Sequence, residues 1–351
     1  MVPPKKASEN DIRREQQTKV CLPPASIVIR RFAALCNTPP YDSSSTDSAH
    51  FLPGLFFIAD DVILLKKKEV ITVKADCHMH MVLDGVDWKQ AIARHTIAPD
   101  EAFIRSLLRR YADLGYTYLR DGGDKWGVGA KAREMSTDFG ITYRTPLAPL
   151  CKAGHYGSFI GKVYETLKEY ADLVVKTREN GGNFIKIMIS GLMDFDRFGV
   201  LTEEGLTQEE IAELIHIAHE EGMAVMAHAN GKTAYYAAVA GVDSVEHGAY
   251  LEEETLHAMK DAGAVWVPTL STVGNLRGKG RFSERSVEKI LESALVNVAA
   301  FHQMGGLLAS GTDAGAWAVP HGCATEEGYF AMAGVDEATL SHGLSAIQAK
   351  F

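Results

Sequence analysis

The sequence has no paired cysteines. Its five cysteines are an odd, scattered set without a C-x-x-C pair: Cys21, Cys36, Cys77, Cys151 and Cys323. Such a set is typical of free thiols in a reducing compartment rather than of a disulfide framework. We therefore expect a cytoplasmic protein.

Long hydrophobic runs are also missing. A membrane-spanning helix needs about 18 apolar residues in a row. The best candidate, residues 51–65, is shorter and carries Asp60 and Asp61. At the N-terminus Lys5 and Lys6 are followed by polar residues, which is not the pattern of a secretory signal. The sequence therefore predicts no membrane partner and no secretion.

Positive charge is in short supply. The chain carries 36 Lys and Arg against 45 Asp and Glu, a net charge of −9. Because nucleic-acid-binding proteins usually present a basic surface to the phosphates, this balance argues against a nucleic-acid partner. It leaves open whether the chain forms a homo-oligomer.

Apolar residues, by contrast, are plentiful. They make up 46% of the 351 residues, which is ample for a large core. Residues 1–70 differ from the rest, because proline pairs and a serine cluster punctuate them with turns. We predict an N-terminal extension of uncertain structure at 1–70 and one domain at 71–351.

From about residue 70 the sequence alternates between strand and helix patterns, which favours a parallel sheet with helical crossovers. The expected strands are 70–80, 116–120, 141–148, 184–189, 223–227, 244–247, 265–270 and 306–310, and the expected helices are 101–114, 128–139, 162–180, 207–221, 231–240, 252–262, 283–304 and 324 onward. Eight such units in about 280 residues predict an α/β fold of the (β/α)8 TIM-barrel type. An open doubly wound sheet is the structural alternative.

Unusual polar residues recur near the ends of these strands, where barrels place their chemistry. His78 and His80 are two residues apart on the first strand, so their side chains point to the same side. The others are Lys186 in strand four, His228 and His247 at the ends of strands five and six, and Asp313 after strand eight. Four imidazoles and a carboxylate suit zinc, manganese or iron.

Each of these residues also has a plainer interpretation. A single strand histidine is commonly a core or surface residue, and Lys186 alone would suit an edge strand. Asp313 alone would suit a helix N-cap. These interpretations are largely independent, and all of them would have to coincide at strand ends. The set as a whole therefore predicts a metal site.

The set His78-x-His80, Lys186, His228, His247 and Asp313 resembles the amidohydrolase superfamily, in the right order and spacing over about residues 71–345. The strings Gly-Val-Asp-Ser-Val-Glu-His-Gly at 241–248 and Gly-Thr-Asp-Ala-Gly at 311–315 look like its branch of imidazolonepropionase-like enzymes and metal-dependent dipeptidases. The resemblance implies a metal-dependent hydrolase acting on a C–N amide bond of a small molecule.

The resemblance also implies a role for each residue. Lys186 would be carboxylated by carbon dioxide and bridge two divalent metal ions, with zinc the expected metal. His78, His80 and Asp313 would bind the more buried ion, and His228 and His247 the other. A hydroxide shared by the metals would be the nucleophile, and Asp313 would move the proton to the leaving amine. His155 resembles a substrate-binding histidine, although an exposed loop histidine explains it equally well.

Two departures from the family pattern stand out. Relatives usually pack a small β-sandwich, built from both termini, against the barrel. Here the sequence stops soon after the last expected helix, and residues 1–70 do not read as half of such a module, so we expect that domain to be absent or rudimentary. The loop at 190–197 is bulkier than expected, and its Asp194 and Arg197 would either reach the substrate or pair with each other.

Three alternatives remain open. A single-metal deaminase on the same barrel would place a glutamate three residues after the strand-five histidine, where this chain has Gly231. A phosphotriesterase-like hydrolase would use the same ligands. A non-catalytic barrel that keeps its metal ligands would bind or assemble rather than hydrolyse.

For the amide hydrolase, the substrate would be a dipeptide, an N-acyl amino acid or a cyclic amide, and the sequence does not choose among them.

Overall fold

The structure is a computed structural model that describes residues 73–351. The expected N-terminal extension, with Cys21, Cys36 and the start of the first expected strand, lies outside the described residues, so the division near residue 70 stays a prediction. In the described part Cys77, Cys151 and Cys323 form no disulfide. No helix of that part is both long and apolar enough to cross a membrane.

The strands form parallel sheets. They are β1 (Lys74–Met79), β2 (Tyr116–Asp121), β3 (Thr142–Arg144), β4 (Leu150–Lys152), β5 (Lys162–Tyr164), β6 (Ile185–Met188), β7 (Val225–Ala229), β8 (Ser244–His247), β9 (Val265–Val267) and β10 (Leu307–Leu308). Over residues 73–351 one sheet has the order β1-β2-β3 and the other β10-β9-β8-β7-β6-β4-β5. Every pairing between named strands is parallel.

Backbone hydrogen bonds also run between the two sheets. The Cys77 amide in β1 donates to the Ser310 carbonyl after β10, at 2.9 Å. At the other junction the Asn183 amide, just before β6, donates to the Thr145 carbonyl after β3, also at 2.9 Å. The two sheets are thus linked at both junctions, within an α/β fold. The strands do not follow the chain order throughout, because β4 lies between β5 and β6. Closure of the (β/α)8 barrel stays a prediction.

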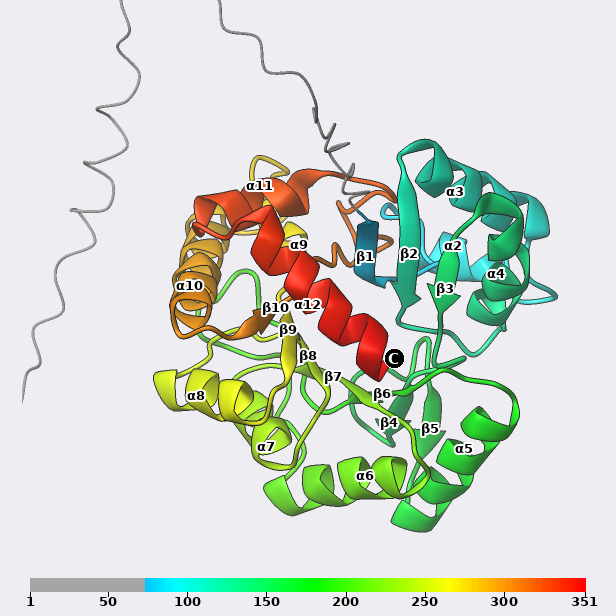
Figure 1. Cartoon of the computed structure of the whole chain (residues 1–351), viewed down its shortest axis with the longest axis horizontal. Helices are drawn as coiled ribbons and strands as arrows, with labels where there is room; N and C mark the ends of the chain where they lie inside the picture. Colours follow the sequence, from blue (N-terminus) through cyan, green and yellow to red (C-terminus); the bar gives the residue numbers. More distant parts are fainter. Residues whose placement is uncertain (1–72) are drawn as a thin grey trace, which may run out of the picture. The chain divides into compact units, whose positions relative to one another are not determined.

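Helices lie on the outside of these strands (Figure 1). They are α2 (Trp88–Ala93), α3 (Glu101–Asp113), α4 (Val128–Ser136), α5 (Leu167–Glu179), α6 (Gln208–Glu220), α7 (Lys232–Val239), α8 (Glu253–Asp261), α9 (Ser271–Gly274), α10 (Glu284–Gln303), α11 (Thr325–Met332) and α12 (Glu337–Lys350). Capping boxes start two of them: Thr166 and Glu169 at α5, and Thr207 and Glu210 at α6.

The last helix, α12, packs across the strands near their amino ends. Its Leu344 and Ile347 share an apolar cluster with Phe184, Met226 and Val265, which lie at or just before the starts of β6, β7 and β9. In Figure 1 α12 crosses in front of the strands. The amino ends of the strands are therefore covered, and the opposite, carboxyl ends carry the loops that hold the predicted site.

Two parts of the sequence prediction were wrong. The helix expected at 162–180 begins only at Leu167, and Lys162–Tyr164 is the short strand β5. The strand expected at 141–148 ends at Arg144, and β4 follows as a separate strand. Pro146 and Pro149 lie between β3 and β4, and proline cannot donate to a strand ladder. The other expected elements are confirmed, with shifted ends.

Candidate metal centre

The six predicted ligands come from four strands or the residues directly after them, and from the segment after β10. His78 lies in β1 and His80 just after it, while Lys186, His228 and His247 lie in β6, β7 and β8. Asp313 follows β10. The register pairs Ala229 with His247, so His228 and His247 lie at similar heights on neighbouring strands. Lys186 pairs with Met226 and therefore lies two residues nearer the amino ends than His228.

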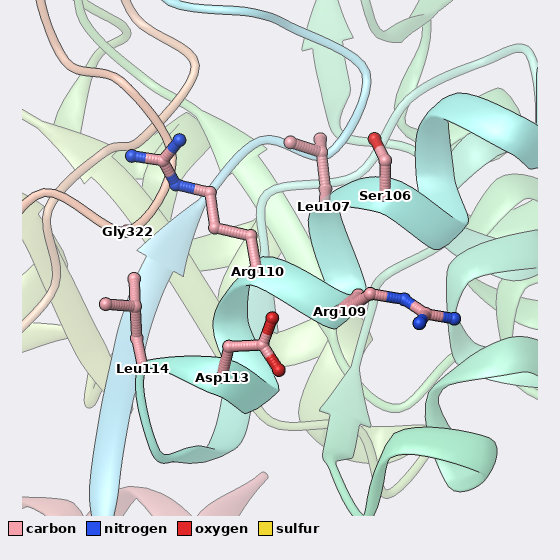
Figure 2. A pocket seen from close by; sticks show the side chains of 7 residues that line it. All are labelled: Ser106, Leu107, Arg109, Arg110, Asp113, Leu114 and Gly322. Atoms are coloured by element: carbon pink, nitrogen blue, oxygen red, sulfur yellow. The ribbon is translucent and has the colours of Figure 1, made fainter.

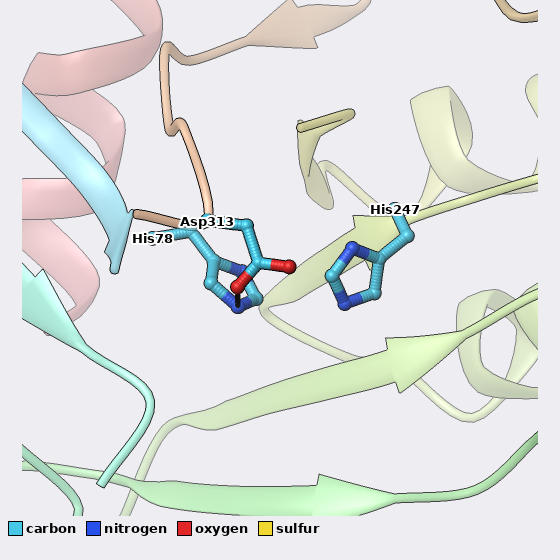
Figure 3. A group of neighbouring side chains, drawn as sticks. All are labelled: His78, His247 and Asp313. Carbon is cyan, nitrogen blue, oxygen red and sulfur yellow. Dashed lines mark ion pairs between the residues drawn. The ribbon is translucent and has the colours of Figure 1, made fainter. Parts of the chain in front are cut away.

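The imidazole rings form a continuous chain. Ring centroids are 5.4 Å apart for His78 and His80, 4.9 Å for His78 and His247, and 4.6 Å for His228 and His247. Asp313 joins the same cluster: its Oδ1 lies 3.5 Å from His78 Nε2 and 3.3 Å from His80 Nε2. Figure 3 shows how Asp313 and His247 face His78 from different elements.

Three of these side chains already have the spacing of metal ligands. In the described part of the chain, His78, His247 and Asp313 each offer one ligand atom, and these atoms lie within 4.8 Å of one another. Burial lowers the pKa of His80 and His228 to about 3, and it lowers the pKa of His78 and His247 well below the usual value. The rings are therefore neutral, the state in which histidine binds metals.

Lys186 lies among the histidines. Its side chain is 1% exposed, and its Nζ has no hydrogen-bond partner among the described residues. Its positive charge lowers the pKa of all four imidazole rings. Burial in turn lowers the pKa of Lys186 itself and raises that of Asp313. A lysine left unpaired in a buried site is costly, so its place here indicates a function.

The backbone is held in an unfavourable conformation at this site. His247 and Asp313 have φ angles of 68° and 57°, in the left-handed region that non-glycine residues rarely adopt. Neighbouring contacts keep them there: His247 Nδ1 lies 2.7 Å from Thr269 Oγ1, and the Asp313 amide donates to the His78 carbonyl at 2.6 Å. Such strain concentrates at functional sites, where it fixes the direction of a side chain.

Sequence reasoning missed a buried carboxylate behind the cluster. Glu246 is fully buried, and its Oε2 lies 2.6 Å from His78 Nδ1. Its other oxygen accepts from Arg120. The signal in the sequence was a charged residue inside the buried strand, directly before His247. Arg120 and Glu246 thus form a buried salt bridge, at 2.8 Å.

His155 lies at the edge of the cluster rather than within it. It is in the turn between β4 and β5, about a third exposed, and its Nδ1 is 3.5 Å from Glu203 Oε1. The next residue, Tyr156, contacts the cluster directly, since its ring centroid is 5.0 Å from that of His228. The substrate role of His155 stays a prediction, and Tyr156 is a neighbour of the site that the sequence did not reveal.

The bulky loop after β6 folds back on itself. The Asp194 amide donates to the Val200 carbonyl at 2.8 Å, and Arg197 Nε donates to Asp194 Oδ2 at 2.6 Å. Asp194 and Arg197 therefore pair with each other, one of the two outcomes expected. At the base of the loop, the Gly191 carbonyl lies 3.3 Å from His228 Nε2.

A surface hollow in the described part of the chain lies elsewhere. It measures about 490 Å³ and is lined by residues of α3 with Leu114 and Gly322 (Figure 2). It contains none of the predicted ligands. A much smaller cavity of about 10 Å³, room for roughly one water molecule, adjoins His247 beneath Met193 and Tyr250. Because the hollow on α3 brings together no catalytic groups, the buried cluster is the better candidate.

Known proteins resemble this chain in sequence and in fold. No family model matches it. Ochratoxinase of Aspergillus niger is 27% identical over 278 residues, covering 68% of this chain and 56% of that protein. The chain thus spans little more than half the length of the curated relatives it matches first.

Solved structures share the fold. A Xaa-Pro dipeptidase with bound methionine in its active site has a TM-score of 0.64 at 21% identity, over 79% of this chain and 75% of that chain. The Aspergillus niger ochratoxinase structure has a TM-score of 0.61 at 23% identity, over 79% and 69%. A putative prolidase from Bifidobacterium longum has a TM-score of 0.59 at 20% identity, over 78% and 68%. Together with the sequence match, these neighbours confirm the resemblance of this chain to the metal-dependent hydrolases of the amidohydrolase superfamily.

Proposed function

We propose that this chain is a binuclear metal-dependent hydrolase, on a (β/α)8 barrel, that cleaves a C–N amide bond. The observation that carries the proposal is the buried cluster at the carboxyl ends of the strands. Four of its polar atoms have no hydrogen-bond partner among the described residues: His78 Nε2, His80 Nδ1, Lys186 Nζ and Asp313 Oδ1. Buried polar atoms are normally satisfied, so a group of unsatisfied ones indicates a ligand that they share.

The donor set fits divalent metal ions. Neutral imidazole nitrogens and a carboxylate are the ligands that zinc takes in catalytic sites. Lys186 fits only if its amine is carboxylated, because a protonated amine cannot bind a cation. Burial favours the neutral, nucleophilic amine that reacts with carbon dioxide, which supports this modification.

The proposed ligand sets follow the family pattern. His78, His80 and Asp313 would hold one ion, and His228 and His247 the other, with carboxylated Lys186 between them. When bound, two such ions polarise the scissile carbonyl and lower the pKa of water toward neutrality. His228 would have to give up its contact with the Gly191 carbonyl, so ion binding there is coupled to the base of the loop after β6.

Asp313 is the proposed proton carrier. Its Oδ1 lies 3.5 Å from His78 Nε2 and 3.3 Å from His80 Nε2. Burial raises the pKa of Asp313 toward the working pH, which suits a group that accepts a proton and then donates it to the leaving amine. His155 would polarise the substrate carbonyl, since its neighbour Tyr156 contacts His228.

The proposed substrate is a small molecule with an amide bond: a dipeptide, an N-acyl amino acid or a cyclic amide. The solved neighbours named as a Xaa-Pro dipeptidase and a prolidase support the first of these. Deamination is disfavoured because Gly231 occupies the place of the expected glutamate, whereas a phosphotriesterase-like reaction uses the same ligands. We place this reaction in the cytoplasm.

A substrate screen tests the proposal. The chain is loaded with zinc in bicarbonate buffer and incubated with panels of dipeptides, N-acyl amino acids, cyclic ureides, phosphotriesters and aminopurines. We expect hydrolysis within the amide panels, and its loss after chelation and in the Lys186→Ala variant. Activity only on phosphotriesters or aminopurines would overturn the amide assignment. Metal binding without any turnover would support the non-catalytic alternative.

A further inference from the structure

Glu246 makes three close contacts with buried side chains, and in two of them the donor is defined. Its Oε1 accepts hydrogen bonds from Arg120 Nη2 at 2.8 Å and from Ser244 Oγ at 2.6 Å. Its Oε2 lies 2.6 Å from His78 Nδ1. Glu246, Arg120 and Ser244 all have 0% exposure, so no water competes for these bonds.

The Arg120 side chain, which binds the Glu246 carboxylate, is itself held by several contacts. Its Nε donates to the Cys77 carbonyl at 2.7 Å, and its Nη1 donates to Ser244 Oγ at 2.9 Å. The Phe351 ring lies 4.5 Å from its Cζ and covers one face of the guanidinium. Since arginine cannot give up its proton in proteins, Arg120 keeps an anionic, acceptor-only carboxylate facing His78.

This arrangement selects one tautomer of His78. A carboxylate can only accept, so the proton of the neutral ring must lie on Nδ1 and the lone pair on Nε2. Nε2 is the atom that faces the cluster, 3.5 Å from Asp313 Oδ1, and it has no hydrogen-bond partner in the described part of the chain. Histidines that bind metals commonly donate their other nitrogen to a carboxylate in this way.

We propose that Glu246, held by Arg120, is a positioning residue that fixes the ring orientation and tautomer of His78 so that Nε2 faces the metal site. The proposal rests on the function proposed above. This role accounts for the buried ion pair between Arg120 in β2 and Glu246 in β8. Buried ion pairs often stabilise a fold no more than apolar residues of similar size, so stability alone does not explain this one.

Glu246→Gln is a nearly isosteric test. The Gln carbonyl can still accept from Arg120 and Ser244, which leaves its amide group to face His78 Nδ1 as a donor. His78 would then have to accept at Nδ1 and carry its proton on Nε2, the wrong tautomer for a ligand at that atom. Glu326→Gln is the matched control, because Glu326 is equally buried and accepts from the Leu270 and Ser271 amides at 2.8 and 2.7 Å.

The first readout needs neither metal nor substrate. Two-dimensional ¹H–¹⁵N spectra of the metal-free full chain, labelled at histidine nitrogens and assigned with His78→Gln, report the tautomer. We expect the Nδ1–H form in the wild type and in Glu326→Gln, and the Nε2–H form in Glu246→Gln. A wild-type His78 in the Nε2–H form would overturn the proposal, whether or not Glu246→Gln folds.

The second readout is zinc affinity, measured by competition with a chromophoric chelator. We expect Glu246→Gln to weaken zinc binding about 10- to 100-fold, and Glu326→Gln to leave it unchanged even where its melting temperature falls. Unchanged zinc affinity in Glu246→Gln would overturn the positioning role of Glu246 but not the proposed function. A wild-type chain that binds no zinc would overturn the proposed function and this role together, and the two failures are therefore distinguishable.

Discussion

Asp313 Oδ1 lies 3.3 Å from His80 Nε2, a contact between the segment after β10 and the segment after β1. The backbone fixes this relationship, because the His80 amide donates to the Ala314 carbonyl at 2.7 Å. The positive φ of Asp313 then turns its side chain inward. The segment after β10 thus brings its carboxylate directly to the histidines of β1 and of the segment that follows β1.

Asp313→Asn should remove proton transfer while keeping the shape of the side chain. We expect the rate of amide hydrolysis to fall about 100- to 10,000-fold, the range typical of a lost general acid or base. Asp194→Asn changes a carboxylate that forms an ion pair with Arg197 within the loop after β6, and it is the control, expected to stay within about twofold of the wild type. Initial rates on the substrate found in the screen check both variants, and an active Asp313→Asn would contradict the assigned role.

Gly122→Ala should displace His80. A Cβ at Gly122 would lie 2.2 Å from His80 Cε1, so the ring must move. A displacement near 1 Å can cost about 100-fold in rate, and we expect zinc affinity to fall as well. Gly328→Ala is the control: nothing lies within 4 Å of its added Cβ, and alanine favours helix α11 by up to about 1 kcal/mol. Equal zinc affinity in the two variants would argue against His80 as a ligand.

His321 should make the fold acid-sensitive. Burial lowers its pKa to about 4, while Nε2 donates to the Leu83 carbonyl and Nδ1 accepts from Tyr111. The folded state therefore disfavours the protonated ring. The contribution of His321 to stability is fully present above pH 6.5 and is lost as pH falls from 6.5 towards 4, by about 2 kcal/mol at pH 5.

His321→Gln should reduce this loss, because glutamine keeps both hydrogen bonds and does not titrate. Urea unfolding of the metal-free chain at pH 7.5 and pH 5 measures the difference in the free energy of unfolding. His257→Gln, which removes an exposed histidine, is expected to behave like the wild type. The account of His321 fails if both variants lose the same stability between the two pH values.

Much of the fold could be predicted because strand and helix patterns differ in period and because glycines and capping residues mark the ends. The capping boxes at Thr166 and Thr207, for example, mark the starts of α5 and α6. The strands β4 and β5 were not predicted, because each has three residues, too few to show the two-residue alternation of a strand. Their pairing also depends on partners distant in the sequence. The alternating pattern alone could not separate β5 from the helix that follows it.

The candidate site was predictable for a different reason. Histidine, lysine and aspartate each have a plainer interpretation at the end of a strand, but their recurrence at several strand ends made His78, Lys186 and Asp313 stand out as parts of one set. The residues behind them did not, because Arg120 and Glu246 are each ambiguous until the fold brings them to 2.8 Å. Tyr156 was likewise one aromatic residue among many before its ring was found beside His228.

Metal binding should stabilise the folded chain. An ion that binds only the native state adds about 2.7 kcal/mol when its concentration is 100 times its dissociation constant. We expect the melting temperature of the chelated chain to rise on addition of zinc, and to rise less in His228→Ala. Differential scanning fluorimetry across a zinc series checks this, and a melting temperature that does not respond to any divalent ion would contradict it.

The central claim is a two-ion site that depends on Lys186, and counting metal ions per chain tests it most directly. The wild type, Lys186→Ala and the control Lys152→Ala, whose lysine pairs with Glu210, are loaded with zinc in bicarbonate, desalted and analysed by mass spectrometry of the metal. The account predicts about two ions per chain in the wild type and the control, and one or fewer in Lys186→Ala. Two ions retained by Lys186→Ala, or none bound by the wild type, would contradict it.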